Sequence, residues 1–147
     1  MLENNIHFIE ADEAIKMRVL NEWGEKAARH MHLAGGFSIV ALHREMLVGL
    51  ISTYWRELPA PLHGEFDAYI DILEVYKDFR RQGIARRLIE MSIEQARQKG
   101  MRQIRSWSSE DKTEAISMWK ALGFGLCPAR TYPNGQEIRG YFVVKIP

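Results

Sequence analysis

The sequence predicts an α/β fold built on one mixed β-sheet, and three observations lead to this expectation. A strand-length apolar stretch at residues 68–75 runs directly into a segment whose apolar residues recur at helical spacing. A further strand-like stretch follows at 101–107, and a strand–helix–strand unit of this kind favours a parallel pair joined by a crossover helix. Two more apolar stretches precede the unit with only a short polar break between them, as in a hairpin.

The N-terminal elements are a short strand and a long helix. Residues 6–10 have the composition of a strand, and Asp12 is suited to cap a helix over residues 13–32. Apolar residues recur through 13–32 at the spacing of one helical face. We expect the pair Gly35-Gly36 to end this helix.

A hairpin comes next, with strands at 37–42 and 47–55 that are rich in apolar and β-branched residues. The polar break between the two stretches supplies the turn. Residues 56–66 contain prolines and a glycine, so we expect them to form the longest loop, which leads into the 68–75 strand.

The second half of the chain begins with the crossover helix, which stops at Gly100. After the strand at 101–107, Asp111 and Glu114 have the spacing of a capping box for another helix. Gly123 suits the position just past the end of that helix.

The C-terminal part predicts a last hairpin, with strands at 125–132 and 137–146 around a turn at 133–135. The complete order is β-α-β-β-β-α-β-α-β-β, with helices on both faces of the sheet. A chain of 147 residues suits one domain, so we expect residues 1–147 to fold as a single unit.

The turn between the 68–75 strand and its helix, Arg80-Arg81-Gln82-Gly83-Ile84-Ala85, has the features of an anion site. A helix start leaves backbone N–H groups without partners, and the helix dipole favours negative charge there. Gly83 lets a phosphate oxygen approach the main chain where a Cβ would block it. The arginines that add positive charge are Arg80, Arg81, Arg86 and Arg87.

The spacing Arg80-x-x-Gly83-x-Ala85 resembles the acyl-CoA signature of the GNAT superfamily of N-acetyltransferases. The pattern Ala115-x-x-x-Trp119-x-x-x-Gly123-Phe124 resembles a later helix of the same family. The resemblance covers residues 68–124 at the level of motifs and the rest of the chain by the order of elements. It implies the acyl-CoA N-acyltransferase fold of that family, with acetyl-CoA as the acyl-donor substrate and no metal.

The resemblance also implies where acetyl-CoA binds. The parallel strands would splay at their C-terminal ends and leave a V-shaped slot, in which the pantetheine arm pairs with freed backbone groups. The pyrophosphate would rest on the basic turn. The residues expected to bind the cofactor are Leu73, Val75, Arg80, Arg81, Gln82, Gly83, Ile84, Ala85 and Arg86.

Transfer to an amine calls for a base, because the neutral form of a lysine-like amine costs roughly 4.6 kcal/mol at pH 7. Asp71 and Glu74 lie on the slot strand, and either carboxylate is a candidate base or a structural hydrogen-bond acceptor. Family members that act on histones use a glutamate on this strand, but Tyr69 stands at the position we align with it. Asp71 shares the strand face of Tyr69, whereas Glu74 points oppositely unless the strand bulges.

The residue expected to protonate the leaving sulfur differs from the family pattern. Trp119 stands where many members carry a tyrosine that protonates or orients this sulfur. An indole N–H cannot deliver a proton, so we expect Trp119 to be a hydrogen-bond donor at most, or a packing residue. The alternatives are water, Tyr141, Ser109 and Lys112. Release of a simple thiol as thiolate at pH 7 is uphill by only about 2 kcal/mol, so a strong acid is not required.

The acceptor side is less defined. His30 and His32 fall near the end of the 13–32 helix, a region that borders the acceptor pocket in this family, and they lack metal-ligand spacing. The aromatic residues that line either this pocket or the core are Trp23, Phe37, Tyr54 and Trp55.

Composition limits the partners. The net charge of +1 creates no global field for nucleic acid or membranes. Cys127 is the single cysteine, which favours a reducing compartment. Residues 1–5 have neither a basic nor an apolar leader region. We therefore expect a cytoplasmic protein whose partners are acetyl-CoA and an amine acceptor, with a homodimer left open.

We interpret the chain as an N-acetyltransferase that moves an acetyl group from acetyl-CoA directly to a primary amine of a small molecule or peptide. Cys127 has no histidine or acidic partner in a motif, so no covalent enzyme intermediate is expected. Two alternatives stay open: a non-catalytic acyl-CoA-binding module of the same fold, and a nucleic-acid-binding module that uses the basic cluster at 80–87.

Overall fold

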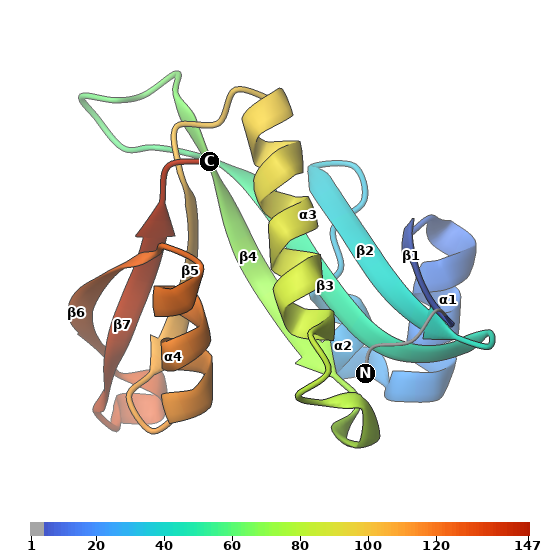
Figure 1. The fold of residues 1–147 in the computed structure, drawn as a ribbon. Helices are drawn as coiled ribbons and strands as arrows, with labels where there is room; N and C mark the ends of the chain where they lie inside the picture. Colours follow the sequence, from blue (N-terminus) through green and yellow to red (C-terminus); the bar gives the residue numbers. More distant parts are fainter. Residues whose placement is uncertain (1–4) are drawn as a thin grey trace.

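The computed structural model describes residues 5–147 and arranges them around one seven-stranded sheet (Figure 1). The first four residues, on which the expectation about a leader partly rests, lie outside the described residues. The elements are β1 (Ile6–Glu10), α1 (Glu13–Trp23), α2 (Glu25–Arg29), β2 (Gly36–His43), β3 (Met46–Glu57), β4 (Phe66–Val75), η1 (Lys77–Phe79), α3 (Ile84–Gln98), β5 (Ile104–Ser109), α4 (Thr113–Ala121), β6 (Gly125–Thr131), η2 (Pro133–Gly135) and β7 (Ile138–Lys145). No helix within residues 5–147 combines the length and the apolar character needed to cross a membrane.

The strands lie in the order β1-β2-β3-β4-β5-β7-β6. Neighbouring strands are antiparallel, except that β4 and β5 are parallel and are joined by the crossover helix α3. This arrangement confirms the predicted mixed sheet and the predicted parallel pair.

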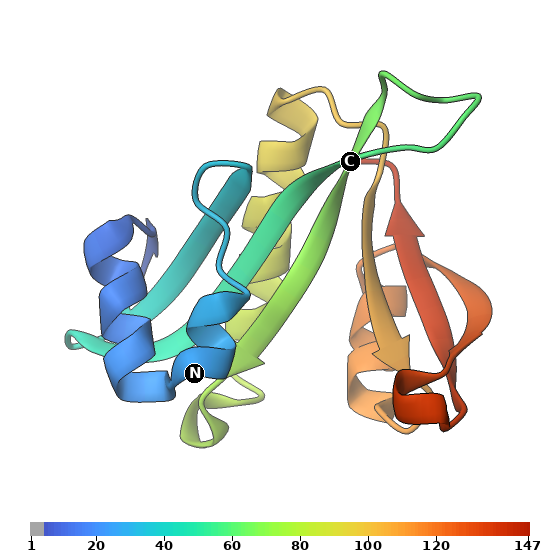
Figure 2. The ribbon, with the colours of Figure 1, turned by 180° about the vertical axis from the view of Figure 1, so that it is seen from behind.

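Helices cover both faces of the sheet, as Figures 1 and 2 show from opposite sides. The apolar side of α3 packs on one face, where Leu88 and Ile89 are fully buried in the main core. On the other face, Val19 of α1 and Ala28 of α2 belong to a second buried cluster. Burial of one large aliphatic side chain contributes about 1.5–3 kcal/mol to the free energy of unfolding, so these contacts hold α3 against the sheet.

The helix predicted over 13–32 is in fact two helices, and the prediction of one continuous helix was wrong. Asp12 caps α1 as predicted, with its Oδ1 accepting from the Ile15 N–H at 2.9 Å. Gly24 then adopts φ +102° and ends α1, and its own N–H donates to the carbonyls of Val19 and Leu20. A glycine adopts this conformation at low cost, which explains why the chain turns here and continues as the short α2.

The second half also departs from prediction in two places. The strand predicted at 101–107 is β5 at Ile104–Ser109. The capping box does not form, because Asp111 accepts from the Ser109 hydroxyl at 2.6 Å and Glu114 pairs with Arg81. Gly123 does end α4 with φ +89°, as predicted.

The parallel pair separates after a short contact. Ala68 pairs with Ile104 and Tyr69 with Arg105, and beyond these residues β4 and β5 diverge into the V visible in Figures 1 and 2. The Ser106 hydroxyl donates to the Ile70 carbonyl at 3.1 Å just past the last pair. The splayed edge predicted for the cofactor is therefore present.

A β-bulge lies in β4 at the point of divergence. Thr53 of β3 pairs with Ile70, but its neighbour Ser52 pairs with Ile72, so that Asp71 is the extra residue. A bulge of this kind bends the strand and redirects the side chains that follow it.

The bulge reverses which residues of β4 face α3. Ala68 packs in the core beneath α3 before the bulge, whereas Leu73 packs against that core after it. Ile72 instead packs against the cluster beneath α1 and α2. Because strand residues alternate, Glu74 shares the face of Ile72 and not that of Leu73. We expected Glu74 to share a face with Tyr69 only if the strand bulges, and the bulge places the two residues on the same face.

Candidate active site

The start of α3, where we predicted an anion site, lies at one end of the V (Figure 1). Gly83 precedes the helix in the left-handed conformation, with φ +85°. The first backbone bond of the helix runs from the Arg87 N–H to the Gly83 carbonyl at 3.0 Å, so the amides before Arg87 precede the helical ladder. A Cβ built on Gly83 has no protein atom within 4 Å. The space in front of the Gly83 Cα is therefore free for a phosphate.

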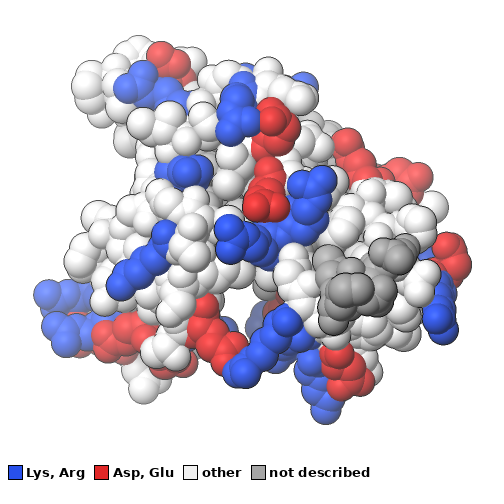
Figure 3. Space-filling model, viewed as in Figure 1, with Lys and Arg blue, Asp and Glu red and all other residues white. Residues whose placement is uncertain are grey.

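The arginines around this turn each have a protein partner. Arg80 Nε donates to the Val75 carbonyl at 2.9 Å. Arg81 adopts φ +62° and pairs with Glu114 across the mouth of the groove between α3 and α4. Arg86 lies 3.6 Å from Glu90 on its own helix. Figure 3 shows that basic and acidic side chains both border the hollow at the lower ends of these helices.

The free edge of β4 faces the same groove. Leu73 and Val75 line it together with Gly83, Ile84 and Ala85 of the turn. Both strand residues lie beyond the part of β4 that pairs with β5. Unpaired backbone groups on a strand edge accept an added amide-bearing chain, and the predicted pantetheine residues and phosphate residues therefore meet in one groove.

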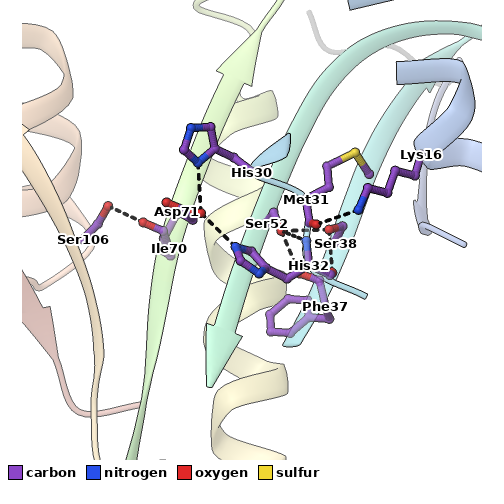
Figure 4. Close-up of polar contacts among 10 residues, drawn as sticks. All are labelled: Lys16, His30, Met31, His32, Phe37, Ser38, Ser52, Ile70, Asp71 and Ser106. Carbon is purple, nitrogen blue, oxygen red and sulfur yellow. Dashed lines mark hydrogen bonds and ion pairs between the residues drawn. The ribbon is translucent and has the colours of Figure 1, made fainter. Parts of the chain in front are cut away.

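Asp71 lies between His30 and His32, as Figure 4 shows. Its Oδ2 lies 3.1 Å from His30 Nδ1 and 2.8 Å from His32 Nε2. Both histidines belong to the segment between α2 and β2, on the α1–α2 face of the sheet. An ionised carboxylate only accepts hydrogen bonds, so each imidazole presents a ring N–H to the same oxygen.

The main chain of His32 is held in place by two buried serines. Its N–H donates to the Ser52 hydroxyl at 2.8 Å, and its carbonyl accepts from the Ser38 hydroxyl at 2.9 Å. The two hydroxyl oxygens lie 2.8 Å apart, and both serines are fully buried. Satisfied buried networks of this kind resist rearrangement, because breaking one bond leaves a desolvated group unpaired.

A cavity of about 800 Å³ lies on the α1–α2 side of β4. Asp71, Glu74 and His30 line it together with the aromatic ring of Trp23. Asp71 also lines the slot between β4 and β5, so this residue borders both spaces. The other aromatic candidates lie elsewhere: Phe37 and Trp55 pack against the main core, with ring centroids 5.4 Å apart, and Tyr54 packs on His32.

Trp119 lines the slot but is only 3% exposed. Its ring meets Phe124 edge-on, with centroids 4.8 Å apart, within the main core. This geometry favours the packing role predicted for Trp119. Tyr141 is half-buried against the same core, and Lys112 lines the slot.

Tyr69, the residue that we aligned with the glutamate of histone-acetylating members of the GNAT superfamily, has an environment that suits a neutral phenol. Burial raises the pKa of the Tyr69 hydroxyl, and the nearby Tyr54 adds to this effect. The rings of the two tyrosines lie 5.5 Å apart, and the Arg56 guanidinium lies 5.1 Å from the Tyr69 ring. At neutral pH this residue is a hydrogen-bond donor and not a base.

Sequence reasoning placed His30 and His32 near the expected acceptor pocket but missed their contacts with Asp71. His30 and His32 are separated from Asp71 by 41 and 39 positions. The one signal in the sequence is the His-x-His spacing beside a region expected to border the acceptor pocket. The partner carboxylate could not be assigned without the fold.

Comparison with known proteins gives a consistent result. The sequence model described as the acetyltransferase (GNAT) family matches residues 4–124. The chain is 32% identical to N-alpha-acetyltransferase 30 of Schizosaccharomyces pombe over 110 residues, which cover 73% of this chain and 71% of that protein.

Solved structures share the fold. NAA60 of Arabidopsis thaliana in complex with acetyl-CoA aligns with a TM-score of 0.77 at 17% identity, covering 97% of this chain and 99% of that one. The ribosomal-protein-alanine N-acetyltransferase of Brucella melitensis aligns with a TM-score of 0.76 at 20% identity, covering 96% and 99%. Given the family match and the shared fold, the chain belongs to the acetyltransferase (GNAT) family, which confirms the predicted acyl-CoA-dependent N-acetyltransferase with acetyl-CoA as its acyl donor.

Proposed function

We propose that this enzyme acetylates the α-amine at the N-terminus of a peptide or protein. The observation that carries the proposal is the position of Asp71, which borders both the slot between β4 and β5 and the cavity on the α1–α2 side. The thioester of acetyl-CoA would enter from the α3–α4 side of the sheet, and the ammonium group of the acceptor would enter from the opposite face. The two would meet at Asp71.

The lining of the cavity supports a peptide acceptor. Its acidic members, Glu22, Asp71 and Glu74, suit an ammonium group, while Trp23 and Ile72 offer an apolar wall for a side chain. The volume of about 800 Å³ exceeds what a small amine would fill. The name of the S. pombe relative, N-alpha-acetyltransferase 30, agrees with this assignment.

The cofactor assignment rests on the groove at the start of α3. The pyrophosphate would accept from the amides around Gln82, Gly83 and Ile84, and Arg86 would add charge. Arg80 and Arg81 would reach the phosphates only by leaving or sharing their present partners, Val75 and Glu114.

In the proposed reaction, the neutral amine nitrogen attacks the thioester carbonyl carbon. The carbon–sulfur bond breaks, and coenzyme A leaves as a thiolate that takes up a proton from water or from Tyr141. The attacking nitrogen, positively charged after the attack, gives up its second proton and so restores that donor, which leaves a neutral amide and a free thiol. The proton of the incoming ammonium passes to a base of the cavity, for which Asp71 and Glu74 are the carboxylate candidates. Trp119 shapes the slot.

The test is release of free thiol from acetyl-CoA with a matched panel of acceptors. We expect peptides with a free N-terminus and no lysine to give the highest rates, and the same peptides with an acetylated N-terminus to give none. Preference for N-acetylated peptides that contain lysine, or for polyamines and aminoglycosides, would contradict the α-amine assignment. Binding of acetyl-CoA without thiol release from any acceptor would favour the non-catalytic module instead.

A further inference from the structure

The cluster formed by His30, Asp71 and His32 carries a further assignment of roles, which rests on the proposed function. We propose that the imidazole of His30 is the general base, and that Asp71 and His32 are positioning residues that hold it. On this view the carboxylate of Asp71 orients the base and does not itself take the proton from the acceptor.

Hydrogen-bond geometry fixes which nitrogen of His30 is available. His30 Nδ1 lies 3.1 Å from Asp71 Oδ2, and because an ionised carboxylate only accepts hydrogen bonds, the proposal places the ring proton on Nδ1. The neutral ring then carries its lone pair on Nε2. The side chain of His30 is 37% exposed and lines the 800 Å³ cavity, so an acceptor can reach this ring.

His32 is held differently from His30. Its Nε2 is the nitrogen that contacts Asp71, at 2.8 Å, and its ring packs against Tyr54 at a centroid distance of 4.8 Å. Its main chain is tied to Ser38 and Ser52. A residue anchored on three sides is suited to fix the carboxylate and not to exchange protons with a substrate.

Proton affinity also favours imidazole over carboxylate for this task. Ordinary pKa values are about 6.5 for histidine, 3.9 for aspartate and 7.7–8.0 for an α-amine. Transfer of a proton from an α-ammonium to an imidazole is thus favoured by about 400-fold over transfer to a carboxylate, the equivalent of about 2.6 pKa units. General bases work best when their pKa lies near the working pH.

Several charged and titratable groups line the cavity or lie beside the cluster. Glu22 and Lys26 come from α1 and α2, Tyr54 and Tyr69 from β3 and β4, and Glu74, Lys77 and Arg80 from the end of β4 and the turn after it. Lys16 of α1 donates to the Met31 carbonyl between the two histidines at 3.3 Å. Because both acidic and basic groups are present, we test the role of His30 by mutating His30 itself.

The first experiment compares His30→Gln, His32→Gln and Asp71→Asn, using the free-amine peptide that gives the highest rate in the acceptor panel. We expect His30→Gln to lower kcat by 10²–10⁴ with an unchanged KM for acetyl-CoA, and to abolish the plateau that a base produces above its pKa. His32→Gln should lower kcat by about tenfold and displace the midpoint of the pH profile while keeping its shape. His63→Gln, in the exposed loop between β3 and β4, is the matched control and should match the wild type.

The outcomes separate the inference from the proposed function. Near-normal kcat and an unchanged pH profile in His30→Gln, together with loss of activity in Asp71→Asn, would overturn the base assignment and leave the proposed function intact. A wild-type chain that releases no thiol with any peptide would overturn both.

A second measurement does not depend on turnover. Nitrogen-15 chemical shifts of the imidazoles report which ring nitrogen carries the proton. We expect His30 to be protonated at Nδ1 in the wild type and to lose this preference in Asp71→Asn. A His30 ring protonated at Nε2 in the folded wild type would overturn the inference.

Discussion

Replacement of Gly83 tests the proposed cofactor site most directly. Its effect on the stability of the fold can be separated from its effect on acetyl-CoA binding. A left-handed φ of +85° costs a residue with a Cβ about 1–2 kcal/mol, whatever the surroundings. The added Cβ of Gly83→Ala has no protein neighbour within 4 Å, so packing is not disturbed. That methyl group would occupy the space proposed for the pyrophosphate.

Gly100 provides a matched control at the other end of α3. It has φ +72°, and a Cβ built on it also has no neighbour within 4 Å. We therefore expect Gly83→Ala and Gly100→Ala to lose about 1–2 kcal/mol of unfolding free energy each. Only the first should weaken acetyl-CoA binding.

The assay is thermal unfolding with and without acetyl-CoA. At a hundredfold excess over Kd a ligand stabilises the wild type by about 2.7 kcal/mol, which raises Tm by about 5–10 °C for a chain of this size. A tenfold weaker Kd in Gly83→Ala would halve this shift, since the stabilisation falls to about 1.4 kcal/mol. An undiminished shift in Gly83→Ala would refute the pyrophosphate assignment.

Three further predictions concern the slot and the face of β4. Trp119→Ala should lower the unfolding free energy by about 3–5 kcal/mol in denaturant titrations, whereas Trp119→Tyr should retain or raise turnover; a strong loss in a folded Trp119→Phe would mean that the indole N–H is used. Glu74→Gln should lower kcat much less than Asp71→Asn, and equal losses measured by thiol release would contradict the roles proposed for the histidine cluster. Because the folded pKa of Tyr69 is raised, its contribution to stability is fully present below pH 10 and is lost as pH rises through the folded value. Tyr69→Phe should therefore flatten the alkaline loss of stability in pH-dependent denaturation, and identical curves would refute this.

Local sequence determined the parts of the site that depend on neighbouring residues. A strand that passes through a basic, glycine-containing turn into a helix exposes amides regardless of what packs around it, so the left-handed turn at Gly83 and the helix start after it could be predicted. The same holds for the Asp12 cap and for Gly123 at the end of α4, which depend on a few consecutive residues. Gly24 shows the limit of this reasoning. The residues before and after Gly24 have helical periodicity, which concealed the end of α1 at this glycine.

Only the tertiary structure decided where the proposed acid–base groups lie. The bulge at Asp71 arises from the pairing of β4 with Ser52 and Thr53 of β3, and a change in strand register leaves no trace in the sequence of either strand alone. The contacts of Asp71 with His30 and His32 join segments about forty residues apart, which come together because α2 and β4 meet on one face of the sheet. The sequence by itself specified the turn and helix start that form the proposed cofactor groove, since backbone amides at a helix start are a local property. The side of β4 that we propose meets the acceptor was decided by long-range pairing and burial.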